Sequence, residues 1–311
     1  MGITRAAFSR PGDPCRQTRK STMRYLGKTA YPYLLMSPAL LLVLLVGVYP
    51  LVYLLVNSFF DFVLIRQDQK KFIFLGNYLA LLRSGDFWFS LRITLEYVCA
   101  STIITFFLGL GIALVLSQSL RLTRFFRSIF ILPLVATPVI VALTWRHIWD
   151  YHFGIMNYFL SGLGIRPVLW LAKPELAMIA IIITDVWQWT PFVILVLEAG
   201  IASVPEQLFE AAKIDGCSAS ARFWHITLPF VRPVIGIALV IRVMDLFRNA
   251  DLIYVITSGG PGNATEVLAY GVFKKAFVNF QIGQAAALAF LLVILTTTIV
   301  SSLLKRLDVK F

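Results

Sequence analysis

Six long apolar stretches alternate with shorter polar segments along this chain of 311 residues. Each stretch holds the roughly 20 residues that an α-helix needs to cross a bilayer. They lie at residues 34–56, 95–116, 125–149, 176–201, 233–256 and 285–304. Because the hydrocarbon core offers no water to unpaired backbone groups, spanning segments form helices that satisfy their own hydrogen bonds. The pattern therefore predicts an all-α membrane protein with six transmembrane helices, the third of which is expected to be kinked by Pro133 and Pro138.

Composition supports membrane insertion, because 59% of the residues are hydrophobic and only 14% are charged, which is unusual for a soluble domain. The net charge of +12 could suggest a nucleic-acid partner. A simpler cause is the excess of Lys and Arg that marks cytoplasmic loops. About 16 of them fall in the N-terminal tail, the turn 119–127, the loop 202–232 and the C-terminus, against about 9 in the other three loops. We therefore expect no nucleic acid, and both termini and the loop 202–232 in the cytoplasm.

The N-terminal residues 1–28 are basic and contain Pro11 and Pro14. We expect them to form a disordered cytoplasmic tail ahead of a transmembrane domain at 29–311, and Met23 is a candidate for the true start. The first apolar stretch is too long for a cleaved signal peptide. The three cysteines offer no disulfide framework and are expected as reduced thiols.

The stretch 203–233 is polar, lies between two apolar runs and contains the signals of a short helix. Ser203 and Glu206 have the spacing of a capping box, and Gly216 can adopt the left-handed conformation that ends a helix. A helix of about a dozen residues is only marginally stable alone in water. It must therefore dock, either on its own helix bundle or on a partner.

A second short helix is expected within the same stretch. Its cap is Ser218 or Ser220, since serine accepts hydrogen bonds from the first free backbone N–H groups. Proline lacks that N–H and clashes inside a helix, so Pro229 and Pro233 are expected to end it. The stretch would then form two short polar helices between the fourth and fifth apolar runs.

Seven positions of this stretch form a recognisable signature. They are Glu210, Ala211, Ala212 and Gly216, followed by Ile226, Leu228 and Pro229. The signature resembles the EAA loop of ABC importer permeases. In that family the loop is cytoplasmic, and its coupling helix sits in a cleft of an ATPase subunit. The resemblance implies that the coupling residues are Glu210, Ala211, Ala212, Asp215 and Gly216.

Three weaker patterns resemble the carbohydrate branch of these permeases, which includes maltose, trehalose and glycerol-3-phosphate permeases. They are Gly76-Asn77-Tyr78, then Gly154, Asn157 and Leu160, and last Gly259-Gly260-Pro261 with Thr265 and Tyr270. The resemblance implies a permease of the bacterial cytoplasmic membrane that works with a second homologous permease chain, two ATPase subunits and an external solute-binding protein. ATP and Mg²⁺ would be bound by the ATPase subunits. The sequence does not identify the carbohydrate.

Polar side chains inside the fourth and fifth apolar stretches are the candidates for a substrate site. Charges within a membrane are costly and usually face a protein interior or a water-filled cavity. Sugars are bound by aromatic rings and by carboxylates or amides, and both types match the substrate-contacting segments of the maltose-permease type. The resemblance implies that the substrate-binding residues are Asp185, Trp187, Trp189, Phe192, Asp245 and Asn249. We expect Trp187 and Asn249 to contribute most, and Asp185 next.

Two features of this site leave alternatives open. Pro191 removes a backbone hydrogen bond and is expected to distort the fourth helix. In a regular helix Trp187 and Trp189 would point to opposite sides, so only a break at the proline would bring both to one cavity. The two aspartates could instead neutralise Arg242 or Arg248, and either tryptophan could pack against a neighbouring helix or lipid.

No motif for catalysis stands out. The phosphate-binding pattern Gly-x-x-x-x-Gly-Lys-Ser/Thr does not occur, and His147 and His152 are expected as interfacial side chains rather than metal ligands. We therefore expect a transport subunit that is not an enzyme, with no metal or cofactor of its own. One alternative is an ion-gradient-driven secondary transporter, which does not explain the EAA loop. Another is a scaffold whose partner permease alone contacts substrate.

Overall fold

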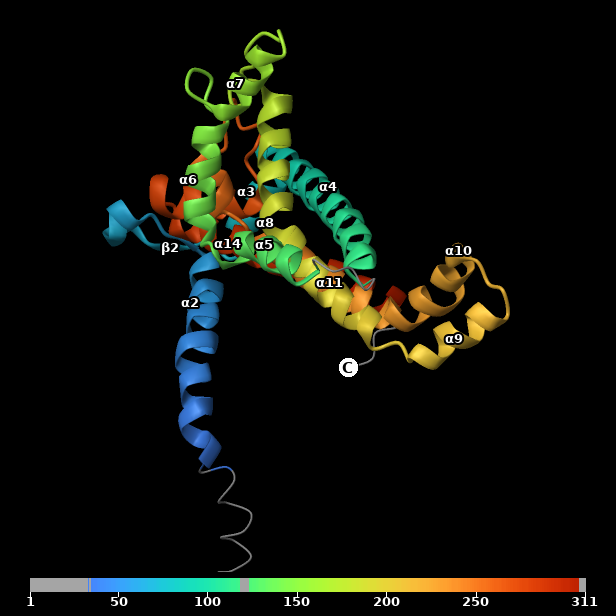
Figure 1. Ribbon diagram of the computed structural model, residues 1–311. Helices are drawn as coiled ribbons and strands as arrows, with labels where there is room; N and C mark the ends of the chain where they lie inside the picture. The colour runs from blue at the N-terminus through green and yellow to red at the C-terminus, as the bar shows by residue number, and fades with distance from the viewer. Residues whose placement is uncertain (1–32, 34, 118–122, 308–311) are drawn as a thin grey trace, which may run out of the picture. The chain divides into compact units, whose positions relative to one another are not determined.

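The computed structural model describes residues 33, 35–117 and 123–307 (Figure 1). The chain divides into two units, Met1–Val56 and Asn57–Phe311. The tail predicted at residues 1–28, including Met23, lies outside the described residues. The predicted fold class is confirmed, because the described chain is built from helices apart from one ribbon of two short strands, β1 (Phe60–Asp61) and β2 (Lys71–Phe72).

The described part of the first unit is one apolar helix. It runs over Leu35–Ser58, close to the predicted stretch 34–56, and only its last residues belong to the second unit. A wider π turn, η1 (Val43–Val48), leads into α2 (Tyr49–Ser58). The helix is apolar around its whole circumference, which is typical of a membrane span.

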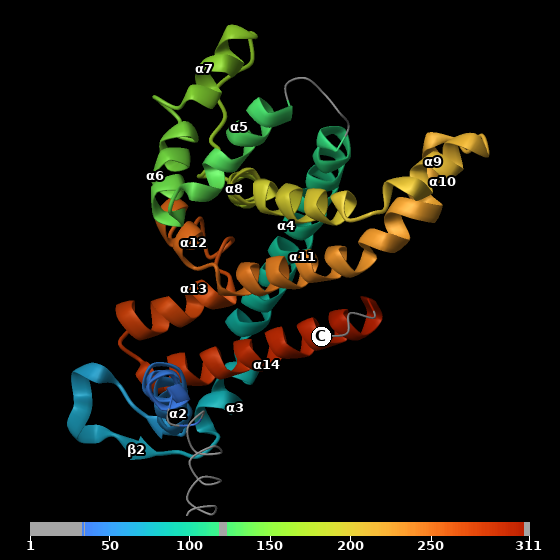
Figure 2. The ribbon, with the colours of Figure 1, turned by 60° about the horizontal axis from the view of Figure 1, so that its bottom comes forward.

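The second unit contains four long helices and several short ones. The long helices are α4 (Gly85–Leu116), α8 (Pro174–Ala202), α11 (Leu228–Arg248) and α14 (Ile282–Leu307). The short helices are α3 (Gly76–Arg83), α5 (Thr123–Val135), α6 (Pro138–Ile148), α7 (Ile155–Gly162), α9 (Glu206–Ile214), α10 (Ala219–Arg222), α12 (Asp251–Ile256) and α13 (Leu268–Phe273). Single wider or tighter turns are η2 (Leu64–Gln69), η3 (Phe223–Thr227) and η4 (Lys274–Val278). In Figure 2, α4 crosses both α8 and α11, and it packs against each of them.

The third predicted span, 125–149, is not a single helix. The segments Arg127–Val135 and Pro138–Ile148 meet at an angle of 101°. The break follows from Pro138, which begins α6 and holds Thr137 before it in an extended conformation. The described chain therefore has five helices long and apolar enough to cross a membrane, or six if this bent pair is counted as one span.

The fifth predicted span, 233–256, is shifted along the chain. A continuous helical segment runs over Ala219–Arg248, so Pro229 and Pro233 do not end the second short helix as expected. Pro229 falls in the first turn of α11, where its missing N–H has little cost. The π turn η3 precedes it, and the Leu228 N–H bonds to the Phe223 carbonyl across that turn.

The fourth predicted span is confirmed by α8, but its expected distortion is not a break. The helix continues from Pro174 to Ala202 through Pro191. A proline inside a helix removes one hydrogen bond, and neighbouring helices in a membrane protein can compensate for that loss. The second and sixth predicted spans are also confirmed, by α4 and α14.

Small residues allow α4 and α8 to pack closely. Ser101, Thr105, Gly109 and Ala113 recur every four residues on α4, and all four are buried. A Cβ atom at Gly109 would lie 2.6 Å from Cγ1 of Val193 on α8. Small residues at this spacing let helix backbones approach each other inside membranes. This contact fixes the position of α8 against α4.

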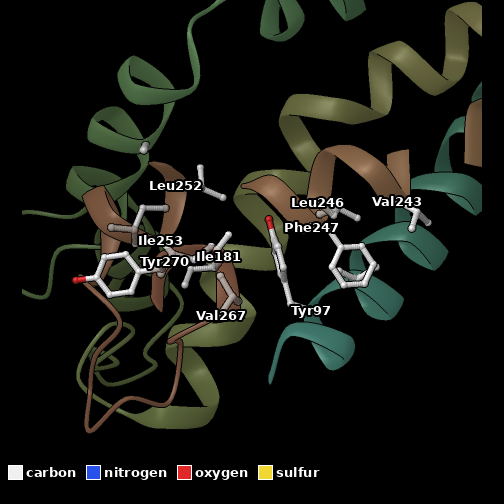
Figure 3. Packing of buried hydrophobic residues seen from close by; sticks show 13 residues of the cluster. Tyr97, Ile181, Val243, Leu246, Phe247, Leu252, Ile253, Val267 and Tyr270 are labelled. Atoms are coloured by element: carbon white, nitrogen blue, oxygen red, sulfur yellow. The ribbon is translucent and has the colours of Figure 1, made fainter. Parts of the chain in front are cut away.

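A hydrophobic core lies where α4, α8, α11, α12 and α13 meet. Tyr97 of α4 is fully buried and stands at its centre, between Phe247 of α11 and Ile253 of α12 (Figure 3). Ile181 of α8 and Tyr270 of α13 belong to the same cluster. The core therefore joins the first half of α4 to the first half of α8 and to the end of α11.

Two of the weaker sequence patterns stabilise loops through buried polar side chains. The amide of Asn77 donates to the backbone carbonyls of Ser58 and Phe60, at 2.8 Å each. The hydroxyl of Thr265 donates to the Gly260 carbonyl at 2.8 Å. These residues hold the connections before α3 and before α13 in place.

The third weaker pattern organises the loop around α7. Buried Asn157 donates to the carbonyls of Tyr151, at 3.1 Å, and Val168, at 3.0 Å. Its carbonyl oxygen accepts from the Val168 N–H, at 3.0 Å, and from the Trp170 indole, at 3.1 Å. Gly154 is required here, because a Cβ atom would lie 2.1 Å from the Asp150 carbonyl.

The close contact of α4 with α8 predicts a difference between two glycines of α4. Gly109→Ala places a methyl group against Val193, whereas Gly111→Ala places it where no atom lies within 4 Å. Overpacking costs about 1–3 kcal/mol, so we expect Gly109→Ala to lower the melting temperature of the purified protein in detergent. Gly111→Ala gains helix propensity and is expected to be neutral or stabilising. Equal melting temperatures would show that this contact does not limit stability.

Candidate functional site

Four charged side chains form a cluster between α8 and α11, called the charge cluster below. They are Asp185 of α8 and Arg242, Asp245 and Arg248 of α11. Arg242 is 1% exposed and pairs with the equally buried Asp185. Its other terminal nitrogen lies 3.4 Å from Asp245, and Arg248 approaches Asp245 to 3.0 Å from the exposed side. The two negative and two positive groups therefore balance.

Burial makes the pair of Asp185 and Arg242 consequential for stability. Two charges removed from water each pay a large desolvation cost, which their mutual attraction offsets only while both are present. The alternative that the sequence left open, in which the aspartates neutralise the arginines, is what the structure shows.

Asn249 connects the charge cluster to α4. Its amide nitrogen lies 3.1 Å from the Tyr97 hydroxyl and 3.4 Å from the Asp185 carboxylate. Asn249 follows the last residue of α11, and its side-chain oxygen accepts from the Leu252 N–H at the start of α12. Asn249 therefore ends α11 and contacts both α4, through Tyr97, and α8, through Asp185.

Trp189 is the aromatic residue that belongs to this cluster. The guanidinium of Arg242 lies 5.4 Å from the centre of its indole ring, within the range of a cation–π interaction. The Phe192 ring packs edge-on against Trp189 at 6.2 Å. Of the six residues predicted to contact substrate, five therefore lie in or next to one cluster: Asp185, Trp189, Phe192, Asp245 and Asn249.

Trp187 lies apart from this cluster. It is 45% exposed, its ring packs against Trp145 at 5.5 Å, and both line an apolar cavity of about 710 Å³ between α4, α5, α6 and α8. Residues two apart in a regular helix are separated by about 200°. Because α8 is not broken at Pro191, Trp187 and Trp189 face different sides.

Sequence reasoning missed two buried polar residues. Tyr97 carries no signal in a single sequence, because a tyrosine in an apolar run is usually a packing residue. Glu198 was detectable, since it is a carboxylate inside the fourth apolar stretch, as Asp185 is. It is buried near the end of α8 and pairs with Arg127 of α5. Glu96, by contrast, is an exposed carboxylate paired with Arg92, as expected for the end of a span.

Of the two histidines for which metal binding was considered, His147 lies in the last turn of α6 and His152 in the loop after it. One carboxylate oxygen of Asp150, in this loop, accepts hydrogen bonds from the backbone N–H groups of His152 and Phe153, at 2.9 Å each. These hydrogen bonds lower the pKa of Asp150 from its usual value. Within the described ranges, no three side chains of His, Cys, Asp or Glu are grouped as metal ligands would be.

The polar stretch 203–233 forms a helical hairpin, α9–α10, but its first cap differs from the expectation. Ser203 does not cap α9, because its hydroxyl donates to the Gly200 carbonyl and Pro205 occupies the cap position. The second cap is Ser218, which accepts from the Ala221 N–H at 3.2 Å. The proposed capping box is therefore wrong, and one of the two serines proposed for the second helix is confirmed.

Gly216 ends α9 as the sequence predicts. Its φ of +72° is left-handed, and its N–H bonds to the Lys213 carbonyl at 3.1 Å. The Cys217 N–H reaches back to the Ala212 carbonyl at 2.9 Å. This pair of bonds is a Schellman motif, and only the backbone conformation requires glycine, since no atom lies within 4 Å of its missing Cβ.

The hairpin projects from the ends of α8 and α11 in both Figure 1 and Figure 2. Of the predicted coupling residues, Glu210, Ala211, Asp215 and Gly216 are exposed, whereas Ala212 is buried. Apolar side chains are exposed beside them, with Ile214 at 87% and Trp224 at 59%. The hairpin therefore presents a mixed apolar and acidic surface without a partner among the described residues.

The fold and these two sites define a helical membrane permease with a projecting hairpin. The chain matches the family described as "Binding-protein-dependent transport system inner membrane component" over residues 101–310. It belongs to that family, and it is therefore an inner-membrane permease component of an ABC transporter.

Curated relatives cover most of the chain. The trehalose/maltose transport system permease protein MalF of Thermococcus litoralis is 40% identical over 235 residues, which are 75% of this chain and 79% of that protein. The trehalose transport system permease protein SugA of Mycobacterium tuberculosis is 33% identical over 92% of this chain and 88% of its own length. A chain of a bacterial ABC transporter involved in the import of the acidic polysaccharide alginate has the same fold, with a TM-score of 0.81 at 21% identity over 92% of this chain and 98% of that chain.

The buried ion pair predicts unequal effects of two neutralising substitutions. Asp185→Asn leaves Arg242 buried with a weaker partner, and breaking a buried pair costs about 3–5 kcal/mol. Glu96→Gln removes an exposed pair worth about 0–1 kcal/mol. We expect a much lower melting temperature for the first variant only, with partial recovery when Asp185→Asn is combined with Arg242→Gln. Equal melting temperatures for Asp185→Asn and Glu96→Gln would contradict this account.

Proposed function

We propose that this chain forms half of the translocation pathway of an ATP-driven importer for a sugar or sugar derivative. It pairs with a second homologous permease chain, two ATPase subunits and an external solute-binding protein. Family membership supports the importer, and the relatives named for trehalose and maltose support a sugar. The single observation that supports this chain's own part is the grouping of Asp185, Trp189 and Asn249 inside the helix bundle.

The hairpin α9–α10 is the proposed contact with the ATPase. A nine-residue helix such as α9 is too short to be stable by itself, and Ile214 and Trp224 remain exposed on its hairpin. An ATPase cleft would cover these apolar groups and meet the exposed carboxylates of Glu210 and Asp215. ATP and Mg²⁺ belong to the ATPase subunits in this proposal.

The proposed orientation follows from the Lys and Arg distribution. The hairpin and both termini lie in the cytoplasm, and the loops before α4, around α7 and before α14 lie outside. The hairpin and α7 lie at separate ends of the second unit in Figures 1 and 2, which supports opposite sides of the membrane for the two.

The proposed sugar contacts are Trp189, Asn249, Asp185 and Asp245, with Phe192 behind Trp189. An indole face can stack on a sugar ring, and the amide and carboxylates can orient its hydroxyls. Trp187 stays a candidate only for a contact outside this cluster. If the charged groups served stability alone, the chain would instead be a scaffold whose partner permease contacts substrate.

The coupling role predicts a position-dependent effect of strain. Valine in a left-handed conformation is strained by about 1–2 kcal/mol, and Gly216, with φ +72°, and Gly164, with φ +76°, both have open space around the missing Cβ. We expect Gly216→Val to weaken ATPase co-purification and uptake by proteoliposomes by about 5- to 30-fold. Gly164→Val, in the loop after α7, applies similar strain and is expected to leave both intact. Normal uptake and ATPase binding in Gly216→Val would exclude the hairpin as the coupling element.

The sugar site predicts which tryptophan matters. In proteoliposomes holding the complete importer, we expect Trp189→Ala and Asn249→Ala to reduce uptake of radiolabelled trehalose or maltose by about 5- to 30-fold, because each removes one contact of about 1–2 kcal/mol. Trp145→Ala is the control, and Trp187→Ala is expected to resemble it. Normal uptake in stably assembled Trp189→Ala and Asn249→Ala importers would place the site on the partner permease.

A further inference from the structure

We infer that the charge cluster makes this permease selective for uncharged sugars over anionic ones. The inference rests on the proposed sugar site and specifies the class of ligand. Relatives of this family are named for both classes, since one is a trehalose/maltose permease and another an sn-glycerol-3-phosphate permease. The charge balance of the site in this chain distinguishes between them.

The two cations of the cluster are already committed to carboxylates. Arg242 lies between Asp185 and Asp245 and is almost wholly buried. Both Nε and Nη2 of Arg248 approach Asp245 Oδ1, at 3.2 and 3.0 Å. An anionic ligand would therefore meet no uncompensated positive charge in the cluster, and its own charge would have no counter-ion there.

The groups that remain for a ligand are neutral or single donors. Nε of Arg242 is buried without a hydrogen-bond partner, and buried polar groups normally have one. A ligand hydroxyl oxygen could accept from this N–H without bringing a charge beside Asp185. The Tyr97 hydroxyl, the Asn249 amide and the Trp189 ring add neutral polar and aromatic contacts. These groups match a polyhydroxyl ligand.

Another arginine of this region has a different position. Arg146 of α6 donates to the Val255 carbonyl of α12 at 3.1 Å, on the exposed side of that short helix. Asp251 at the start of α12 is an exposed carboxylate and adds no positive charge. The cluster itself is therefore the element that sets the local charge.

Direct binding to the complete complex, without the solute-binding protein, tests this selectivity. The probes are matched pairs measured by isothermal titration in detergent: trehalose with trehalose 6-phosphate, maltose with maltobionate, and glycerol with sn-glycerol 3-phosphate. We expect at least one neutral member to bind at least about tenfold more tightly than its anionic counterpart, because the cluster offers the anion no counter-charge to offset its lost hydration. Equal or tighter binding of the anionic members would overturn the selectivity while leaving the sugar site in place.

Substitutions at Asp185, Asp245 and Glu198 test whether the charge cluster causes the preference for neutral probes. Asp185→Asn leaves one net positive charge in the cluster, and we expect it to reduce the preference for the neutral probe by at least about tenfold. Asp245→Asn is the second variant, for the case that Asp185→Asn does not assemble, since Asp245 is more exposed and its loss frees Arg248. Glu198→Gln removes the same charge from α8 about 20 Å along the helix and should leave the preference unchanged. An unchanged preference in both aspartate variants, or an equal change in Glu198→Gln, would overturn the inference, and binding of no probe by the wild-type complex would overturn the sugar site with it.

Discussion

The buried pair of Asp185 and Arg242 is the interaction on which the centre of this permease depends. Each charge alone would be costly in an apolar bundle, so each requires the helix that carries the other. The pair thereby fixes α8 against α11. Tyr97 and Asn249 extend the contact to α4 and to the start of α12. Stability and a candidate binding site therefore use the same few polar groups.

The close packing of α4 on α8 makes this arrangement possible. Gly109 admits Val193 where any larger side chain would separate the helices. With the two backbones held close together, the Tyr97 hydroxyl reaches Asn249 beside the charge cluster, while the Tyr97 ring lies in the apolar core (Figure 3). The small residues from Ser101 to Ala113 and the large aromatic Tyr97 one turn before them thus act together to enclose charges between helices.

Much of this architecture was predictable from the sequence, because membrane insertion depends on residue-by-residue hydrophobicity. Four of the six spans and the glycine that ends α9 follow from local rules. The bend at Pro138 is the kink expected of the third span. The continuation of α11 through Pro233 and the unbroken α8 at Pro191 do not follow from local rules, because a proline's effect depends on the packing around it. The partners of Asp185 were an open alternative for the same reason, since a sequence shows which charges are buried but not which helices meet. Glu198 could have been predicted as a buried polar residue, because it is a charge inside the fourth apolar stretch.

The charge cluster and the hairpin are connected through the same two helices. The hairpin α9–α10 joins the end of α8 to the start of the helical segment that continues into α11, and Asp185 and Arg242 lie on these same two helices. From the hairpin, the pair is about 27 Å away along α8 and about 35 Å along the other segment. Both helices therefore connect the hairpin to the ion pair, α8 through Pro191 and the other segment through η3, Pro229 and Pro233. In the proposed importer, a movement of the ATPase that changes the angle between these helices must also change the geometry of the pair. Separating the two charges in an apolar environment is costly, so the pair links the position of α8 to that of α11.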